Sequence, residues 1–372
     1  MNAWLRPAAC AAFALVALGL SACSGGGVGA AQGSAHAVAF VANSQGNSVS
    51  AYAIDPATGA LTDIAGSPFA AGAAPLSVAV DTAGRFAYVT NPGIQKITAF
   101  AVNAATGALS AVPGSPFAAP GAAEVVAVSP SGTFAYATDP HDNTLIAYGI
   151  NPGNGALSPV AGSPFADDGG PLDVAVDPSG KFAYSTNAAG NSVSAYTIDP
   201  STGALTAVAG SPFAAGSSAQ FLAIGPSGKF LYATNYTGNT VSAYQIDSAT
   251  GALSALAGAP VATGAGPEVI AISPSGAFAY VANSGSNNVS AYAVNSTTGA
   301  LTPVPGSPFA AGGLPIGVAV DPSGQFAYVT NAGANTISAY SINAANGALT
   351  PIAGSPLPAG AGPALIAVTA LP

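Results

Sequence analysis

Short apolar runs alternate with turn-forming residues along the whole chain. One clear unit runs from Pro267 to Phe309 and reads PEVIAISPSGAFAYVANSGSNNVSAYAVNSTTGALTPVPGSPF. Its first apolar run is followed by a Ser-Pro-Ser-Gly turn and two segments in which apolar and small or polar residues alternate. Alternation with a period of two is the pattern of β-strands. A fourth segment begins at Ala-Leu, so each unit is predicted to contain four short antiparallel strands.

In the unit that begins at Pro75, the first three predicted strands cover residues 76–80, 85–90 and 97–102. The fourth starts at Ala108-Leu109 and runs into Gly-Ser-Pro-Phe. The proline there indicates an outer edge strand or the end of that strand, where no backbone donor is needed. The phenylalanine that ends it is expected to pack between units.

The unit recurs every 48 residues without insertion or deletion. Four strands per repeat are typical of a propeller blade, whereas a helical solenoid would show a period of 3.6. We therefore predict an all-β, seven-bladed propeller. One aromatic column is expected in the core between blades: Tyr52, Phe100, Tyr148, Tyr196, Tyr244, Tyr292 and Tyr340. Turn geometry is expected to explain a second column: Asn43, Asn91, Asp139, Asn187, Asn235, Asn283 and Asn331.

The two ends of the repeat region complement each other. The region begins near Ala37 with a second strand, and residues 363–368 form a first strand with nothing after it. The C-terminal strand is therefore predicted to join the N-terminal three, which would close the ring and remove its open edges. The propeller domain is predicted to span residues 37–372.

The N-terminal residues are predicted to lie outside the propeller. Residues 8–20 are apolar and Leu20-Ser21-Ala22-Cys23 follows, which resembles the lipobox of bacterial lipoproteins. The resemblance implies a leader over residues 1–22, a lipidated Cys23, a tether over residues 23–36 and, because Ser24 follows, an outer-membrane location. A plain secretory leader is the alternative. We expect a monomer that is anchored to the membrane by lipid.

Composition narrows the choice of partners. Half of the residues are hydrophobic, 5% are charged and the net charge is −9, so nucleic acid is excluded as a partner. The two cysteines are Cys10 in the predicted leader and Cys23, so no thiolate is left for a disulfide or a metal site in the repeats.

The segments FAYVTN, VSAY and DPSGKFAYV resemble the YVTN-repeat and lactonase-like seven-bladed propellers, which include 6-phosphogluconolactonase-type and muconate-cycloisomerase-type enzymes. The resemblance implies an active site at one end of the central tunnel, built from Arg, His and Glu near the starts of the innermost strands. The corresponding pairs here contain no Arg or His: Leu76-Ser77, Glu124-Val125, Leu172-Asp173, Gln220-Phe221, Glu268-Val269, Ile316-Gly317 and Ala364-Leu365.

The few charges divide between the two faces of the predicted ring. Arg85, Lys181 and Lys229 follow the first turn of their units and belong to the opposite face, so only Lys96 accompanies the starts of the innermost strands. That candidate face is acidic, and it would repel a phosphorylated or carboxylated lactone. Its acidic residues are Glu124, Asp139, Asp142, Asp167, Asp168, Asp173 and Glu268.

One region departs from the repeat. Asp-Pro-His-Asp occupies residues 139–142, Asp-Asp occupies 167–168, and Asp173 with Glu124 opens neighbouring inner strands. These carboxylates and His141 are predicted to converge. A ligand or Ca²⁺ site is one interpretation, and a general-base role for His141 is another. A solvated acidic patch explains the same residues, and we favour it.

Three functions remain open. The first is an envelope-tethered module that binds a protein or small molecule without catalysis. The second is a lactonase-like hydrolase or cycloisomerase that acts on a neutral lactone or sugar-derived substrate. The third is a structural or adhesive envelope protein. No cofactor is expected apart from the Ca²⁺ alternative.

Overall fold

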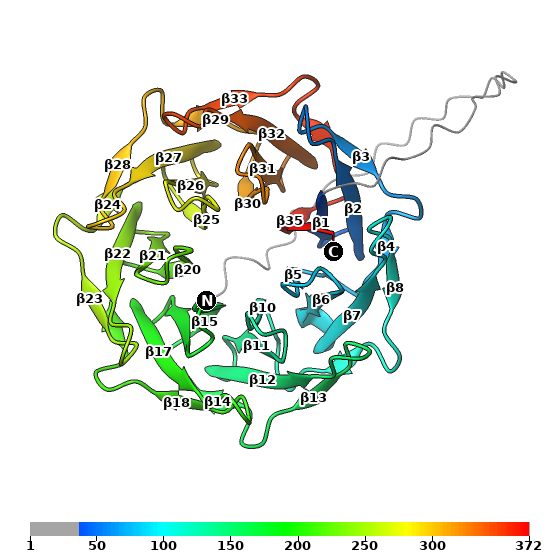
Figure 1. The fold of residues 1–372 in the computed structure, drawn as a ribbon, viewed down its shortest axis with the longest axis vertical. Helices are drawn as coiled ribbons and strands as arrows, with labels where there is room; N and C mark the ends of the chain where they lie inside the picture. The colour runs from blue at the N-terminus through cyan, green and yellow to red at the C-terminus, as the bar shows by residue number, and fades with distance from the viewer. Residues whose placement is uncertain (1–36, 372) are drawn as a thin grey trace, which may run out of the picture. The chain divides into compact units, whose positions relative to one another are not determined.

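The computed structural model describes residues 37–371, which form a closed ring of seven antiparallel sheets (Figure 1). Within each sheet the strands follow one another from the centre of the ring outward. The only helical element in this range is the single turn η1 (Pro92–Ile94). The predicted all-β, seven-bladed propeller is confirmed.

The innermost strands surround the centre of the ring, and each contains an alanine flanked by aliphatic residues. In five blades the pairing between the innermost strand and the second strand shifts in register near the start of the innermost strand. We number the blades in chain order, so blade 1 contains the N-terminal and C-terminal strands. For blades 2 to 7 and then blade 1 the innermost strands are β5 (Val78–Val80), β10 (Val126–Val128), β15 (Pro171–Val176), β20 (Ala219–Ile224), β25 (Pro267–Ile272), β30 (Pro315–Val320) and β35 (Pro363–Ala370).

The second and third strands are almost completely buried because neighbouring blades cover both of their faces. The second strands, from blade 1 onward, are β1 (Ala37–Asn43), β6 (Phe86–Asn91), β11 (Phe134–Asp139), β16 (Phe182–Asn187), β21 (Phe230–Asn235), β26 (Phe278–Asn283) and β31 (Phe326–Asn331). The third strands are β2 (Ser48–Ile54), β7 (Lys96–Val102), β12 (Thr144–Ile150), β17 (Ser192–Ile198), β22 (Thr240–Ile246), β27 (Asn288–Val294) and β32 (Thr336–Ile342).

The outermost segment of each blade divides into two short pieces that both pair with the third strand. In blade 1 the serine between the pieces explains the break: Ser67 Oγ accepts the Ala51 N–H at 3.0 Å, in place of a backbone carbonyl. The paired pieces are β3 (Leu61–Asp63) with β4 (Phe69–Ala70), β8 (Leu109–Ala111) with β9 (Phe117–Ala118), β13 (Leu157–Pro159) with β14 (Phe165–Ala166), β18 (Leu205–Ala207) with β19 (Phe213–Ala214), β23 (Leu253–Ala255) with β24 (Val261–Ala262), β28 (Leu301–Pro303) with β29 (Phe309–Ala310), and β33 (Leu349–Pro351) with β34 (Leu357–Pro358).

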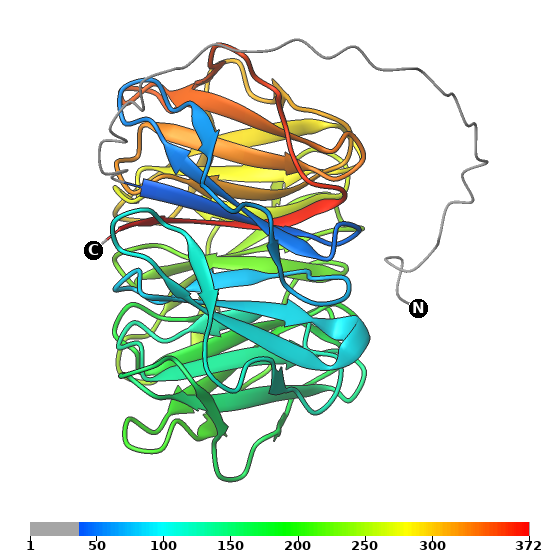
Figure 2. The same cartoon turned by 90° about the vertical axis from the view of Figure 1, so that its right-hand side faces the viewer.

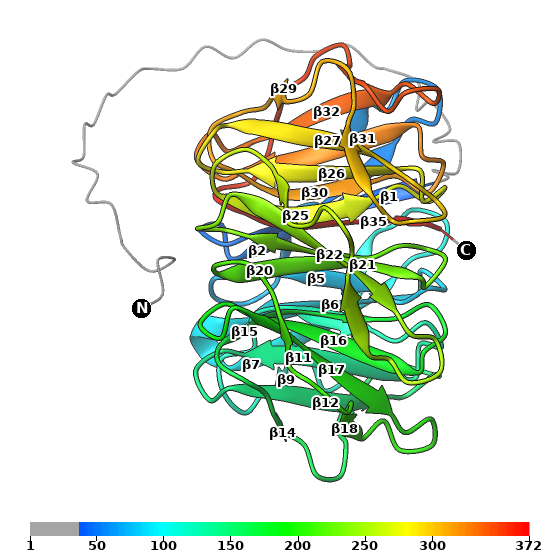
Figure 3. The same cartoon turned by 90° about the vertical axis from the view of Figure 1, so that its left-hand side faces the viewer.

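The ring closes as predicted. The C-terminal strand β35 pairs antiparallel with β1, with Val38 opposite Thr369 and Phe40 opposite Ala367. Figures 2 and 3 show the red C-terminal strand beside the blue N-terminal strand. Blade 1 is therefore built from both ends of the repeat region, and no inner strand is left unpaired.

Neighbouring blades are held together by a repeated contact between a tyrosine, a phenylalanine and a glycine. Tyr88 donates its hydroxyl to the carbonyl of Gly155 in the next blade at 3.0 Å. The ring of Phe86 lies so close that a Cβ on Gly155 would be 2.4 Å from it, and Gly155 has a positive φ of 75°. Only glycine fits this position, which explains why the residue before each Ala-Leu never varies.

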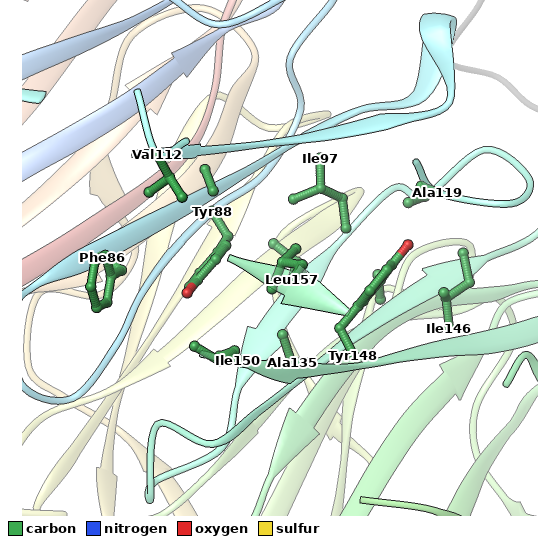
Figure 4. Packing of buried hydrophobic residues seen from close by; sticks show 14 residues of the cluster. Phe86, Tyr88, Ile97, Val112, Ala119, Ala135, Ile146, Tyr148, Ile150 and Leu157 are labelled. Atoms are coloured by element: carbon green, nitrogen blue, oxygen red, sulfur yellow. The ribbon is translucent and has the colours of Figure 1, made fainter. Parts of the chain in front are cut away.

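The aromatic column also lies between blades, as predicted. Tyr148 is 1% exposed and donates its hydroxyl to the carbonyl of Ala118 in the preceding blade at 2.8 Å. Figure 4 shows Tyr88 and Tyr148 among the aliphatic side chains that fill the space between blades 2 and 3. Phe117, from the end of the outer segment, packs against the same cluster.

Most loops between the second and third strands contain two asparagines, and the two have different roles. Asn47 has a left-handed backbone (φ 52°), as expected from turn geometry, and its Oδ1 accepts the Ala74 N–H. Turn geometry does not explain the first asparagine. Asn43 is fully buried, and its amide donates to the hydroxyls of Ser48 and Ser50.

Deleting residues 363–372 is expected to destabilise the whole ring. The deletion removes the partner of β1 and the buried side chains of Ala364 and Leu365. Loss of a buried leucine alone costs about 2–5 kcal/mol, so we expect the melting temperature to fall by about 10 °C or more. A chain that lacks only its last residue is the control. An unchanged melting temperature in the longer deletion would contradict closure by β35.

Candidate functional site

One residue from each blade lines a cavity of about 160 Å³ at the centre of the ring. Because all seven inner strands contribute, the cavity lies on the axis. We call these seven residues the channel ring: Ser77, Val125, Asp173, Phe221, Val269, Gly317 and Leu365. Five of the seven are apolar or glycine, and Val78, Val126 and Ile366 add further apolar wall.

The residue that precedes each channel-ring residue in the sequence lies near the start of an innermost strand, at one end of the channel. We call this second set the mouth ring: Leu76, Glu124, Leu172, Gln220, Glu268, Ile316 and Ala364. Three members are polar, and Gln220 and Glu268 belong to adjacent blades. Both are buried, with 4% and 2% of their surface exposed.

Glu268 is an acid without a countercharge. Its Oε1 accepts a hydrogen bond from Ser284 Oγ at 3.0 Å, and its Oε2 is buried with no partner. Burial raises the pKa of Glu268 to about 8, because the single hydroxyl offsets only part of the lost hydration. At neutral pH its carboxyl is therefore mostly protonated.

The repeat also changes beside Glu268. In blade 2 the hydroxyl of Thr90 accepts the Ser77 N–H and donates to the carbonyl of Glu124 in the next blade at 2.6 Å. Ala282 occupies the equivalent position in blade 6. This pair of hydrogen bonds is thus missing next to the buried acid, which leaves blade 6 less constrained at the mouth.

Asp173 is the acid of the channel ring. It is 8% exposed, and its two carboxyl oxygens accept the backbone N–H groups of Val174 at 2.8 Å and of Leu222, in the next blade, at 2.9 Å. Burial nevertheless raises the pKa of Asp173 to about 7. Asp173 therefore joins two blades and also presents a carboxyl to the cavity.

Glu124 is half-buried at the mouth. Burial, with a smaller contribution from the negative charge of Asp139, raises the pKa of Glu124 to about 7. Three carboxyls at one end of the channel thus titrate near neutral pH. Within residues 37–371 the only ion pair joins Arg85 to Asp81 at 3.5 Å, on the opposite face, so none of the three has a basic partner.

The fold of the chain agrees with one family. The family described as "Lactonase, 7-bladed beta-propeller" matches residues 47–221 and 126–315. The chain belongs to this family. A search of curated proteins finds no match.

Solved structures of lactonase propellers have the same architecture. A proposed 6-phosphogluconolactonase from Bacteroides uniformis is 18% identical with a TM-score of 0.79, over 90% of this chain and 99% of that one. A second, from Bacteroides fragilis, is 22% identical with a TM-score of 0.77, over 91% and 99%. The periplasmic gluconolactonase of Pseudomonas aeruginosa is 18% identical with a TM-score of 0.76, over 90% and 100%. At these identities the likeness establishes the fold.

The acidic residues predicted to converge lie in different surroundings in this lactonase propeller. His141, Asp142 and Asp168 are exposed. Asp167 points into blade 4, where it accepts hydrogen bonds from the hydroxyls of Ser185 and Ser194. Asp173 lines the channel, and Glu124 and Glu268 lie at its mouth.

Asp139 is fully buried in the position that asparagine occupies in the other blades. Its Oδ1 accepts the His141 N–H at 3.1 Å, and its Oδ2 has no partner. The hydroxyl of Thr144 is also buried without a partner. The predicted cluster therefore does not form one site around His141.

The geometry gives the Ca²⁺ alternative no support. Among the residues that the structure describes, no three His, Cys, Asp or Glu side chains lie close enough together to hold a metal ion. No helix in the same range is long and apolar enough to cross a membrane. Cys23, predicted to carry the lipid, lies outside the described residues.

The sequence pattern does not single out Ser284, the hydrogen-bond partner of Glu268. Gln220 can be found by comparing equivalent positions, since Leu76, Leu172 and Ile316 occupy the mouth position where Gln220 stands. That Glu268 is buried rather than solvated depends on how adjacent blades pack, which the repeat pattern does not show.

Replacing Asp139 with Asn is expected to stabilise the protein. The equivalent Asn43 donates to the hydroxyl five residues later, and the amide introduced by Asp139→Asn would donate to Thr144 in the same way. One buried hydrogen bond is worth about 1 kcal/mol, so the melting temperature should rise by about 1–3 °C. Asp142→Asn, on the exposed part of the loop, is the control. A lower melting temperature for Asp139→Asn would show that the unpaired carboxylate is better satisfied than the structure indicates.

Proposed function

We propose that the protein is an envelope-tethered binding module that takes an uncharged or cationic small molecule at the mouth of its channel. One observation carries the proposal: Asp173 lines the channel, Glu124 and Glu268 stand near the starts of two other innermost strands at the same end, and none has a basic partner within residues 37–371. A concave site lined by carboxyls attracts cations and accepts hydrogen-bond donors, and it repels anions.

Stability alone gives no reason for the two mouth acids, Glu124 and Glu268. A buried carboxyl without a full set of partners costs folding free energy, and leucine, isoleucine and alanine occupy other positions of the same mouth ring. Residues that break a local rule at a cost in stability are typical of functional sites. Acids with pKa values moved toward neutrality inside a cleft are typical of them as well.

The same charges argue against a phosphorylated substrate. Binding of a sugar phosphate or carboxylate would require arginine, lysine or a metal beside the acids. Lys96 is the only basic residue at the ends of the second and third strands on this side of the ring. Membership of the lactonase family therefore supports the location of the site. It does not support 6-phosphogluconolactone as the substrate.

The proposed tether rests on the lipobox-like residues that end at Cys23. A lipid at this cysteine would hold the propeller at the bacterial envelope, with residues 24–36 as a spacer. Replacing Cys23 with Ala should release the protein from the membrane fraction. An unchanged membrane fraction would contradict lipid anchoring at this residue.

Hydrolysis of a neutral lactone is the second candidate. A carboxyl whose pKa lies near the working pH suits a general base, and the pKa values of about 7 and 8 for Asp173 and Glu268 meet that condition. Glu268 also has an oxygen without a partner. Exposed His141 has no hydrogen bond to these acids, so a lactonase here would depend on Glu268 or Asp173.

Three sugars that share one ring and differ in one substituent test the proposal. At pH 7.5 glucose is neutral, glucosamine is partly cationic and glucuronate is anionic. We expect glucosamine or glucose to raise the melting temperature and glucuronate to have no effect. A bound ligand stabilises the folded protein by RT ln(1 + [L]/Kd), and the shift in melting temperature is this free energy divided by the unfolding entropy. Glu268→Leu, which removes the carboxyl and installs the residue found in blades 2 and 4, should weaken the response to glucosamine about tenfold, while the exposed control Asp142→Asn leaves it unchanged.

Stabilisation by glucuronate alone would contradict the proposed charge selection. Hydrolysis of D-glucono-1,5-lactone, corrected for the spontaneous reaction, separates the two candidate functions in the same preparations. Turnover that disappears in Glu268→Gln would establish the enzyme, and binding without turnover would establish the module.

A further inference from the structure

The channel cavity has the size and lining of a site for a small apolar group. Its volume is about 160 Å³, and most of its wall comes from aliphatic residues and Phe221. A cavity of about 150 Å³ lined by leucine, isoleucine and phenylalanine is large enough to bind benzene. A chain of four to six carbon atoms therefore fits the available space.

The wall contains two polar groups, the carboxyl of Asp173 and the hydroxyl of Ser77. Each oxygen of Asp173 accepts one backbone N–H. A carboxylate can accept about four hydrogen bonds, so each oxygen retains a lone pair for a ligand. No basic side chain lines the cavity.

We propose that the channel cavity binds a small primary ammonium ion that carries a short apolar tail. The ammonium group donates to the Asp173 carboxylate, and the tail lies against Val125, Phe221 and Leu365. This inference deepens the proposed function and rests on the same end of the channel, because the ligand must pass the mouth ring.

Charge and shape together select this class of ligand. An ammonium ion supplies the missing countercharge to a carboxylate in an apolar ring, where Coulomb attraction is much stronger than in water. A neutral alcohol of the same shape offers one hydrogen bond and no charge. A carboxylate of the same shape would place two negative groups together.

The repeat supports a specific role for Asp173. The equivalent residue of blade 2, Ser77, lies 3.5 Å from the Val126 N–H of the next blade, which is the place that Asp173 takes toward Leu222. In the other five blades this position is valine, phenylalanine, glycine or leucine. Six of the seven blades therefore pack without a carboxyl at this position, and the carboxyl of Asp173 is particular to blade 4.

Binding is linked to protonation. An ammonium ion binds the ionised carboxylate, so at low pH the ligand must first displace the proton of Asp173. The other groups toward this end are the Ser77 hydroxyl, which does not titrate in this range, and the mouth acids Glu124 and Glu268. Both acids become negative as the pH rises, which favours a cation in the same direction.

The experiment titrates the full-length protein with n-butylammonium, n-butanol and butyrate at pH 6.0 and 8.5, followed by calorimetry. We expect n-butylammonium to bind about tenfold more tightly at pH 8.5 than at pH 6.0, and about tenfold more tightly than n-butanol at pH 8.5. Butyrate should not bind. Equal binding of n-butanol, a reversed pH dependence, or no binding of n-butylammonium overturns the inference.

Asp173→Ser gives the matched variant, because it installs the residue that blade 2 already has. It should keep the cooperative melt and lose the preference for n-butylammonium over n-butanol, and an unchanged preference overturns the inference. Asp142→Asn is the control. If Asp173→Ser does not fold, Phe221→Trp fills the cavity while Asp173 stays in place, and retained n-butylammonium binding then overturns the inference.

Phe221→Trp also adds a spectroscopic signal, since the only tryptophan of the chain is Trp4, in the predicted leader. Failure of this inference can be distinguished from failure of the proposed function. If n-butylammonium does not bind but glucosamine is still preferred over glucuronate, only the cavity assignment falls. If both preferences are absent, the proposed function falls as well.

Discussion

The contact between a tyrosine hydroxyl, a phenylalanine ring and a glycine of the next blade governs this structure. Tyr88 must reach the carbonyl of Gly155, and Phe86 fills the space that a side chain on Gly155 would need. The distance between these residues along the chain is fixed, so the unit keeps its 48-residue length in every copy. The tyrosine bond to the glycine carbonyl recurs at six of the seven junctions between blades. At the seventh, Val38 and Phe40 take the places of the phenylalanine and the tyrosine, and Val38 lies against Gly107. An insertion in one blade would therefore shift the packing of two.

This constraint separates the residues that build the ring from those that can differ between blades. Core columns hardly vary, whereas the mouth ring changes from leucine to glutamate, glutamine, isoleucine and alanine. The channel ring likewise includes serine, aspartate, glycine and phenylalanine. Buried acids occur at these two variable levels without countercharges. The residues that differ most between blades are therefore concentrated near the axis, at the end where the innermost strands begin, and this is where we propose that a ligand binds.

The sequence was sufficient for the blade count, the strand order and the closure of the ring, because periodicity alone determines them. It did not reveal the divided outer strand, which depends on Ser67 accepting a backbone N–H. It placed the acids on one face but not in one site. Asp167 turns inward because Ser185 stands where most blades have valine or alanine, and Glu268 is enclosed by its neighbours. Such effects arise from tertiary contacts between unlike copies of the repeat.

The central claim is that burial moves the pKa values of three carboxyls at the channel end up to neutral pH or slightly above it. Titration of the side-chain carboxyl resonances by NMR tests this directly, with Asp55 as an internal reference because hydrogen bonds from Thr58 and Ala57 lower its pKa. We predict a pKa of about 8 for Glu268 and about 7 for Glu124 and Asp173. Ordinary pKa values, 4.5 for the two glutamates and 3.8 for Asp173, would contradict the account.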